Sequence, residues 1–171
     1  MTVALRAQEA SDTEFLHALF SDAATTRYWF VEPYLTRADV QAQFERRRGD
    51  DSARRFVISD EGADVGIVEL VDISPLHRTC EFQIIVAPGN QGRGYAHTAT
   101  KLVLDYAFGT LNLHKVYLLV DVENAGAIHV YTKAGFEAEA TLCEEFYADG
   151  AYRDVVRMAV FARDWGITGS R

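Results

Sequence analysis

A glycine-rich segment at residues 91–96 has the residue types of an anion-binding loop. It reads Gln91-Gly92-Arg93-Gly94-Tyr95-Ala96 and stands where a predicted strand ends and a predicted helix begins. Glycines at such a junction leave several backbone N–H groups free to point at one phosphate, and the positive end of the helix adds to the attraction. The segment lacks the third glycine of a dinucleotide fingerprint and the Gly-Lys-Ser/Thr of a P-loop. It therefore predicts a pyrophosphate site, with an ordinary glycine-rich turn as the alternative.

A polar pair, Asn124 and Tyr131, follows in the next predicted helix. The two residues are seven positions apart (131 − 124), close to two helical turns, so both lie on one helix face with Ile128 between them. A tyrosine with a pKa near 10 can give its proton to a departing thiolate, whose conjugate acid has a pKa of about 8.5 to 9, at small cost in free energy. Tyr131 is therefore our candidate general acid, and the alternative is a core tyrosine bonded to a backbone carbonyl.

Four carboxylates supply complementary chemistry for an amine. Glu81 lies in a predicted strand at 79–86, Glu69 lies in the strand before it, and Glu32 and Asp72 lie further out. An alkylammonium has a pKa near 10, so a site that acylates it must remove a proton, and carboxylates both attract the cation and accept that proton. We expect Glu81 and Glu69 near the amine. The alternative for each acid is solvation or a salt bridge to one of three arginines, Arg54, Arg55 and Arg78.

These residues depend on an alternation of strands and helices. A strand at 3–6 precedes a helix opened by a capping box at Ser11–Glu14 and a second helix starting near Thr36. Apolar patterns then predict an antiparallel meander of three strands, at 55–58, 65–72 and 79–86. The elements after it are a helix following the glycine loop, a strand at 115–121, a helix at 124–134, and two long strands from Phe136 joined at Asp149-Gly150. The order predicts an α/β chain with a mixed sheet.

Composition predicts one folded domain over residues 1–171. Apolar residues make up 49% of the chain, and the net charge of −8 disfavours nucleic acid and anionic lipid and favours a small cationic or neutral partner. The start of the chain shows no signal-peptide pattern and no apolar run reaches the roughly 20 residues of a membrane span, so we expect a cytoplasmic protein with no membrane partner. Cys80 and Cys143 are isolated and the histidines lack H-x-x-x-H spacing, so no metal is expected.

The loop and the helix together resemble the GCN5-related N-acetyltransferase (GNAT) superfamily. Within it the chain is most similar to bacterial spermidine N-acetyltransferases, over nearly its whole length. The matching stretches before the glycine loop are 27–30, 32–34, 54–57, 68–73 and 81–85. Those after it are 111–115, 120–121, 123–124, 127–129 and 145–147.

The resemblance implies a GNAT acyl-CoA N-acyltransferase fold, with about seven mixed strands flanked by about four helices. It also implies acetyl-CoA as co-substrate without a metal, a polyamine acceptor such as spermidine or spermine that attacks the thioester directly, and a homo-oligomer. The catalytic residues would be Tyr131 and Glu81, and the substrate-binding residues Tyr28, Glu32, Glu69 and Asp72. The acetyl-CoA-binding residues would be Ile84, Ile85, Val86, Gln91, Gly92, Arg93, Gly94, Tyr95, Ala96, Asn124 and Lys133. Backbone groups of 84–86 could pair with the pantetheine amides as an added strand would.

One segment departs from the polyamine branch. That branch places several acids around the proline and in the loop after it, whereas this chain reads Val31-Glu32-Pro33-Tyr34-Leu35-Thr36-Arg37. We therefore expect acetyl transfer to be retained and allosteric polyamine binding at a subunit interface to be lost. Two alternatives stay open: an acetyltransferase for an amino acid, aminoglycoside or peptide N-terminus, and a non-catalytic acyl-CoA sensor.

Overall fold

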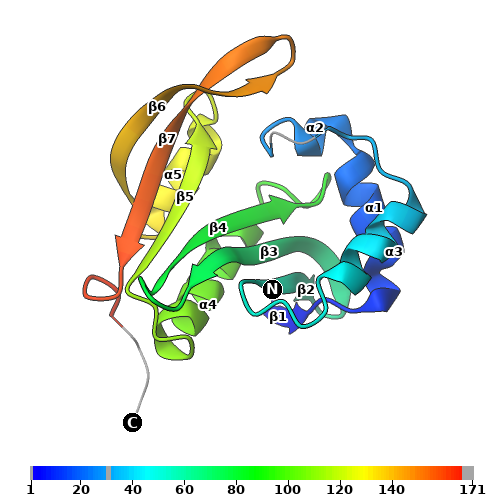
Figure 1. Ribbon diagram of the computed structural model, residues 1–171, viewed down its shortest axis with the longest axis horizontal. Helices are drawn as coiled ribbons and strands as arrows, with labels where there is room; N and C mark the ends of the chain where they lie inside the picture. Colours follow the sequence, from blue (N-terminus) through cyan, green and yellow to red (C-terminus); the bar gives the residue numbers. More distant parts are fainter. Residues whose placement is uncertain (1, 30–31, 167–171) are drawn as a thin grey trace.

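A seven-stranded mixed sheet, in the order β1-β2-β3-β4-β5-β7-β6, organises the computed structural model, which describes residues 2–29 and 32–166 (Figure 1). The strands are β1 Val3–Ala7, β2 Arg54–Asp60, β3 Ala63–Ser74, β4 Thr79–Val86, β5 Lys115–Asp121, β6 Glu137–Ala148 and β7 Ala151–Phe161. The helices are η1 Ala10–Asp12, α1 Thr13–Ser21, α2 Ala23–Thr26, α3 Arg37–Arg46, α4 Tyr95–Gly109 and α5 Ala125–Lys133. The predicted fold class is confirmed, and the single turn α2 is the α-helix that the sequence did not predict. Phe30 and Val31 of the family motifs lie outside the described residues.

Alternating side chains of the sheet strands pack into two separate apolar clusters. Val57 and Ile67 pack with residues of α1 and α3, whereas Ile58 and Val68, one position further along each strand, pack with residues of α4. Successive side chains of a strand point to opposite faces of the sheet, so each apolar run contributes to both clusters. The helices therefore cover both faces, with α1 to α3 gathered at one end in Figure 1.

The parallel strands β4 and β5 pair only at their beginnings. Their register runs from Thr79↔Lys115 to Glu81↔Tyr117, and β5 then continues in full antiparallel pairing with β7. Beyond Glu81 the two strands diverge, as Figure 1 shows. In the second half of β4, the backbone groups that point toward β5 therefore have no hydrogen-bond partner on β5.

The hairpin of β6 and β7 confirms the predicted turn. Asp149 and Gly150 both have left-handed backbones, with φ of 52° and 81°, as a tight hairpin turn requires. The tip of this hairpin reaches the α2 region, where the Arg27 Nε lies 3.1 Å from an Asp149 carboxylate oxygen. An ion pair therefore joins the hairpin tip to the segment after α2.

The first two predicted helix starts have different outcomes. The start near Thr36 is confirmed, because Thr36 is the N-cap of α3: Asp39 N–H donates to the Thr36 hydroxyl at 3.1 Å and Thr36 N–H donates to Asp39 at 2.9 Å. The capping box at Ser11 is wrong. Residues Ala10–Asp12 form a 3-10 turn, and the Asp12 carboxylate accepts from Glu9 N–H and from Arg6, so α1 begins only at Thr13.

Candidate active site

A groove opens where β4 and β5 diverge. Two adjoining cavities, of about 380 and 450 Å³, share five lining residues: Tyr28, Trp29, Ile84, Asn124 and Tyr131. A third cavity of about 300 Å³ shares further lining with the second one, through Val86, Gln91, Gly92, Ala96 and Val130. The three form one continuous path, which we call the acyl groove. It runs from the glycine loop before α4, past α5, to Glu81 on β4.

The loop end of the groove begins at a helix N-terminus. Gly92 and Gly94 have φ of 75° and 85°, values that glycine adopts without strain, and Gly94 is the N-cap of α4. Because Gly94 has no side chain to cap the helix, the first backbone N–H groups of α4 stay available to an anion. The loop backbone is therefore compatible with an anion, and the pyrophosphate site stays a prediction.

Lys133 and Tyr95, two of the predicted acetyl-CoA-binding residues, both line the loop end of the groove. Lys133, at the end of α5, adds positive charge there. Tyr95 is buried and its hydroxyl donates to Asp60 at 2.7 Å, an acceptor at the end of β2. Tyr95 therefore fixes the start of α4 against the sheet. The sequence did not single out His97 and His129, which also line this end, because isolated histidines give no spacing pattern.

Tyr131 lies on the groove wall, held by two phenylalanines. Its ring packs edge-on against Phe82 of β4, with centroids 5.8 Å apart, and against Phe136 at 6.0 Å. The side chain is half-buried, and loss of hydration around the hydroxyl raises the pKa of Tyr131. No hydrogen bond joins this hydroxyl to another of the described residues. The backbone-bonded core tyrosine considered above is therefore not what the structure shows.

Asn124 lies on the same groove wall as Tyr131, as the seven-residue spacing predicted. It is also the N-cap of α5, because its Oδ1 accepts from Ala127 N–H at 3.1 Å. A helix cap satisfies a backbone donor that the helix itself leaves unpaired. Asn124 therefore has a structural task, which the sequence prediction did not include, in addition to lining the groove.

Trp29 occupies part of the unpaired edge of β4. Its indole Nε1 donates to the carbonyl oxygen of Ile84 at 3.0 Å, and its ring contacts Phe20 of α1 edge-on at 5.6 Å. The sequence predicted backbone groups of 84–86 as partners for pantetheine, but it gave no sign that an aromatic donor reaches one of them. Trp29 and Tyr28 together form the wall opposite α5.

Glu81 is the predicted acid that the structure brings to the groove with Tyr131. It lines the inner cavity, and the side-chain amide of Gln83 donates to its carboxylate at 2.9 Å. Asp72 lies in an irregularity of β3 with φ of 50°, and the negative charges of Glu81 and Asp72 both raise the pKa of Tyr117, after burial. Glu81 and Asp72 therefore lie within electrostatic range of one ring on β5.

Glu69 and Glu32 lie apart from Tyr131. Glu69 is 5% exposed, lies 3.6 Å from Arg55 Nε, and does not line the acyl groove. This is the salt bridge that the sequence left as the alternative. Glu32 lines a separate cavity of about 270 Å³ between the α2 region and the hairpin tip, with Arg27 and Asp149. Of the four predicted carboxylates, Glu81 alone shares a cavity with Tyr131.

Comparisons with known proteins agree with this fold. The family model described as an acetyltransferase (GNAT) domain matches residues 2–137, and the chain belongs to that family. It is an acetyltransferase by that membership.

Curated and solved relatives give a finer comparison. The chain is 44% identical over 164 residues to the spermidine N(1)-acetyltransferase of Escherichia coli K12, which covers 96% of this chain and 88% of that relative. It is 45% identical to the enzyme of the same name from Vibrio cholerae, with 91% of each chain covered. A crystal structure of the Vibrio cholerae enzyme in complex with CoA and spermine matches with a TM-score of 0.93 and 43% identity, covering 95% of this chain and 96% of that one.

Within residues 2–29 and 32–166, no group of three or more His, Cys, Asp or Glu side chains is arranged to hold a metal ion. In the same part of the chain, no helix is long and apolar enough to cross a membrane.

Proposed function

We propose that this protein transfers the acetyl group of acetyl-CoA to an amine of a polyamine such as spermidine or spermine. The observation that supports this most strongly is the continuity of the acyl groove, which joins an anion-binding helix start to Tyr131 and then to Glu81. An acyl-CoA has this order of groups, with an anionic end and a thioester at the far end of a long arm. The two relatives described above, both named spermidine N(1)-acetyltransferase, support the choice of acceptor.

The loop end of the groove suits the pyrophosphate of acetyl-CoA. The N–H groups of α4 after Gly94 and the charge of Lys133 provide donors and positive potential there. Arg93 does not line the cavity, but it adds positive charge from its exposed position in the loop. The unpaired edge of β4 beyond Glu81 suits the pantetheine arm, because an extended amide chain can pair with a strand edge. Ile84, Ile85 and Val86 are on that edge, and Trp29 already contacts the Ile84 carbonyl.

Glu81 and Tyr131 suit the two proton transfers. The attacking amine must be neutral, so a polyamine nitrogen that enters as an ammonium gives a proton to Glu81, directly or through water. Its lone pair then attacks the thioester carbonyl carbon, the C–S bond breaks, and Tyr131 protonates the leaving thiolate. Burial raises the pKa of Tyr131, so the phenol stays protonated at neutral pH, and its proton transfer to the thiolate costs more free energy than that of an ordinary tyrosine.

The carboxylates at the Glu81 end of the groove suit a second ammonium group of a polyamine. Asp72 follows Val71, which is the β3 partner of Glu81, whereas Tyr117 is its β5 partner, and both acids raise the pKa of Tyr117 electrostatically. A polyamine carries ammonium groups separated by alkyl chains, so one nitrogen at Glu81 leaves another free to approach Asp72. Tyr28 on the opposite wall offers an aromatic surface to such a cation.

We also propose a cytoplasmic homo-oligomer without nucleic-acid or membrane partners. The net charge of −8 supports the absence of polyanionic partners. Two free cysteines, Cys80 and Cys143, fit a reducing compartment. The long edge strand β6, exposed along most of its length, supports self-association, because exposed strand edges pair readily.

The proposal is tested by thiol release from acetyl-CoA with a panel of acceptors. Spermidine, spermine, putrescine, lysine and an aminoglycoside are compared at equal concentration with a reaction that lacks acceptor. We expect spermidine and spermine to give the highest kcat/KM. A faster reaction with lysine or the aminoglycoside would reject the polyamine assignment while keeping the acetyltransferase. Tight acetyl-CoA binding without thiol release in any reaction would support an acyl-CoA sensor.

A matched pair of variants tests the place of the acceptor. Glu81→Gln removes the carboxylate in the groove, and Glu32→Gln removes one in the separate cavity beside Arg27. We expect Glu81→Gln to lower kcat/KM for spermidine by about 100-fold, the usual size of a lost general base, with little effect from Glu32→Gln. Equal effects of the two changes would contradict this place for the acceptor.

A further inference from the structure

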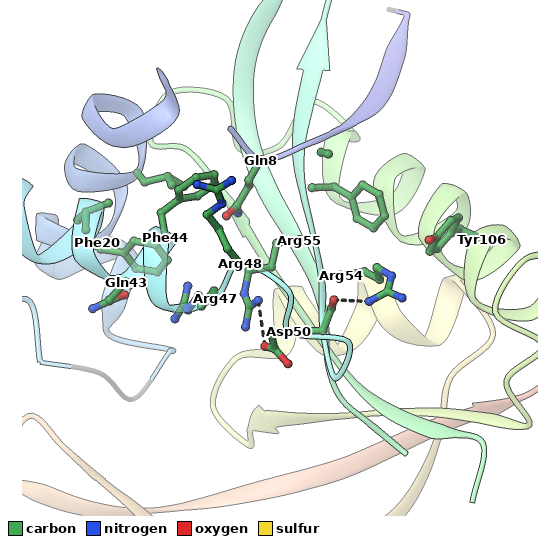
Figure 2. A pocket seen from close by; sticks show the side chains of 15 residues that line it. Gln8, Phe20, Gln43, Phe44, Arg47, Arg48, Asp50, Arg54, Arg55 and Tyr106 are labelled. Carbon is green, nitrogen blue, oxygen red and sulfur yellow. Dashed lines mark hydrogen bonds and ion pairs between the residues drawn. The ribbon is translucent and has the colours of Figure 1, made fainter. Parts of the chain in front are cut away.

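A second large cavity lies away from the acyl groove, between α1, α3 and the start of β2 (Figure 2). Its volume is about 380 Å³, and none of its lining residues belongs to the acyl groove. Four arginines line it: Arg47, Arg48, Arg54 and Arg55. We call it the arginine cavity. The acetyl-transfer reaction proposed above makes no use of it.

The positive charge of the arginine cavity exceeds the negative charge around it. Asp50 is its lining acid, and the buried Glu69 lies behind Arg55. Arg55 reaches both carboxylates at long distances, 3.5 Å to Asp50 and 3.6 Å to Glu69, and its buried Nε makes no hydrogen bond with the described residues. With the Glu45 carboxylate that pairs with Arg48, four guanidinium groups face three carboxylates, which leaves one positive charge in excess. This excess of positive charge at the cavity favours binding of an anion.

The other arginines leave donors available at the cavity. Arg47, at the end of α3, forms no ion pair with the part of the chain that the structure describes, and loss of hydration lowers its pKa. Arg48 reaches Glu45 at 3.4 Å, and both side chains are well exposed, so that pair is weak. Arg54 donates to two backbone carbonyls, of Asp51 and Ala53.

Most of the remaining wall of the arginine cavity is apolar or aromatic, with two polar side chains, Gln8 and Gln43, beside it. The apolar and aromatic part consists of Leu16, Phe20, Val40, Phe44, Phe56 and Tyr106, with the small side chains of Ala7 and Ala53. Figure 2 shows Phe20 and Phe44 together on one side of the arginines and Tyr106 on the other side. A bare inorganic anion would leave these walls without a partner. A ligand with an apolar body and an anionic head would use both parts of the cavity.

We propose that the arginine cavity binds a small organic carboxylate with an aromatic or short aliphatic body. A guanidinium group presents parallel N–H donors that match the two oxygens of a carboxylate. Burial of the body against the phenylalanines adds stabilisation in proportion to the apolar area removed from water. The site faces a different part of the molecule from the amine and acetyl-CoA, so its ligand is an additional one.

The test is isothermal titration calorimetry of the full chain with 4-phenylbutyrate and with its neutral amide. We expect saturable binding of the carboxylate and at least about tenfold weaker binding of the amide, because hydrogen bonds to charged groups have about that net value. The double variant Arg47→Gln/Arg48→Gln should weaken carboxylate binding by a similar factor. The control Arg46→Gln removes a neighbouring charge on α3 that does not line the cavity, and its affinity should stay within about twofold of wild type.

Several results would overturn the proposal. These are equal affinity for carboxylate and amide, no saturable binding, or the same loss in Arg46→Gln as in the double variant. Inorganic phosphate is a further probe, and phosphate binding as tight as that of 4-phenylbutyrate would show a simple anion site and reject the apolar body. Unchanged acetyl transfer in the double variant shows that it is folded. Phe44→Ala supplies a second line of evidence, because it should weaken 4-phenylbutyrate binding while the arginines stay in place.

Discussion

The ring of Tyr131 meets the ring of Phe82 edge-on, with centroids 5.8 Å apart and an interplanar angle of 82°. Phe82 is the first residue of β4 after its pairing with β5 ends at Glu81. The point at which the sheet opens is therefore also the point that positions the tyrosine. Glu81 and Phe82 are adjacent in the strand, so their side chains leave opposite faces, and the divergence of β5 lets both reach one groove.

Tyr131→Phe tests the proton donor. The change keeps the ring and its contacts with Phe82 and Phe136, and removes only the hydroxyl. We expect kcat to fall about 100-fold while the Kd for acetyl-CoA stays close to that of wild type. Steady-state kinetics and a direct acetyl-CoA titration measure the two quantities separately. Activity equal to wild type would reject Tyr131 as the acid.

The pH dependence of kcat/KM gives a second prediction. The neutral amine is the nucleophile, so the rate should rise with pH as the ammonium form is depleted. Burial raises the pKa of Tyr131 above its ordinary value near 10. The Tyr131 hydroxyl therefore stays protonated at mildly alkaline pH and loses its proton only above about pH 10. We therefore expect no falling limb below about pH 9.5. A decline between pH 8 and 9 that disappears in Tyr131→Phe would show the opposite shift.

Gly66→Ala tests the close pairing of β3 and β4. A Cβ at position 66 would overlap the carbonyl oxygen of Ile85, which is backbone and cannot move away freely. We expect a loss of about 1–3 kcal/mol in the free energy of unfolding, as for other overpacked sites. Gly109→Ala, at a position where a Cβ meets nothing within 4 Å, is the matched control. Denaturant melts of both variants make the comparison, and equal stabilities would contradict the close approach.

Thiol reactivity separates the two cysteines. Burial raises the pKa of Cys80 to about 12, so its thiolate is scarce at pH 8, whereas Cys143 is exposed on β6. Iodoacetamide should therefore label the native protein once, at Cys143, and label both residues after denaturation. Peptide mass spectrometry identifies the labelled site. Labelling of Cys80 in the native protein at a comparable rate would show that the core around β4 opens readily.

Spermine titrations test the acid-poor segment at 31–37. Glu32 lines a cavity in which Arg27 already pairs with Asp149, and Arg37 pairs with Glu14 at 2.7 Å. We expect hyperbolic dependence of the rate on spermine, because few uncompensated acids are left there to hold a second polyamine. A sigmoidal curve would mean that a regulatory polyamine site is present.

Local patterns predicted much of the fold. Strand alternation, the helix start at Thr36 and the Asp149-Gly150 turn depend on neighbouring residues, so the sequence shows them directly. The start of α1 was missed because the Asp12 carboxylate is held by Arg6, a partner on β1. That contact appears only once the chain has folded.

The candidate site was predictable where spacing along one element determines it. Asn124 and Tyr131 share a helix, and Gly92 and Gly94 share a loop, so each pair was found together. Glu69 could not be placed this way, because the strand pattern does not say which face meets Arg55. The contact of Trp29 with the Ile84 carbonyl joins residues 55 positions apart and has no pattern in the sequence.

The most direct test of the central claim is the product formed from acetyl-CoA and spermidine. Mass spectrometry of the amine, with parallel measurement of free CoA, follows both halves of the transfer in one reaction. The account predicts mono-acetylated spermidine and free CoA in equal amounts, and an initial rate that falls by about the same factor in Glu81→Gln as in Tyr131→Phe. CoA release without acetylated amine, or acetylation that neither change slows, would contradict it.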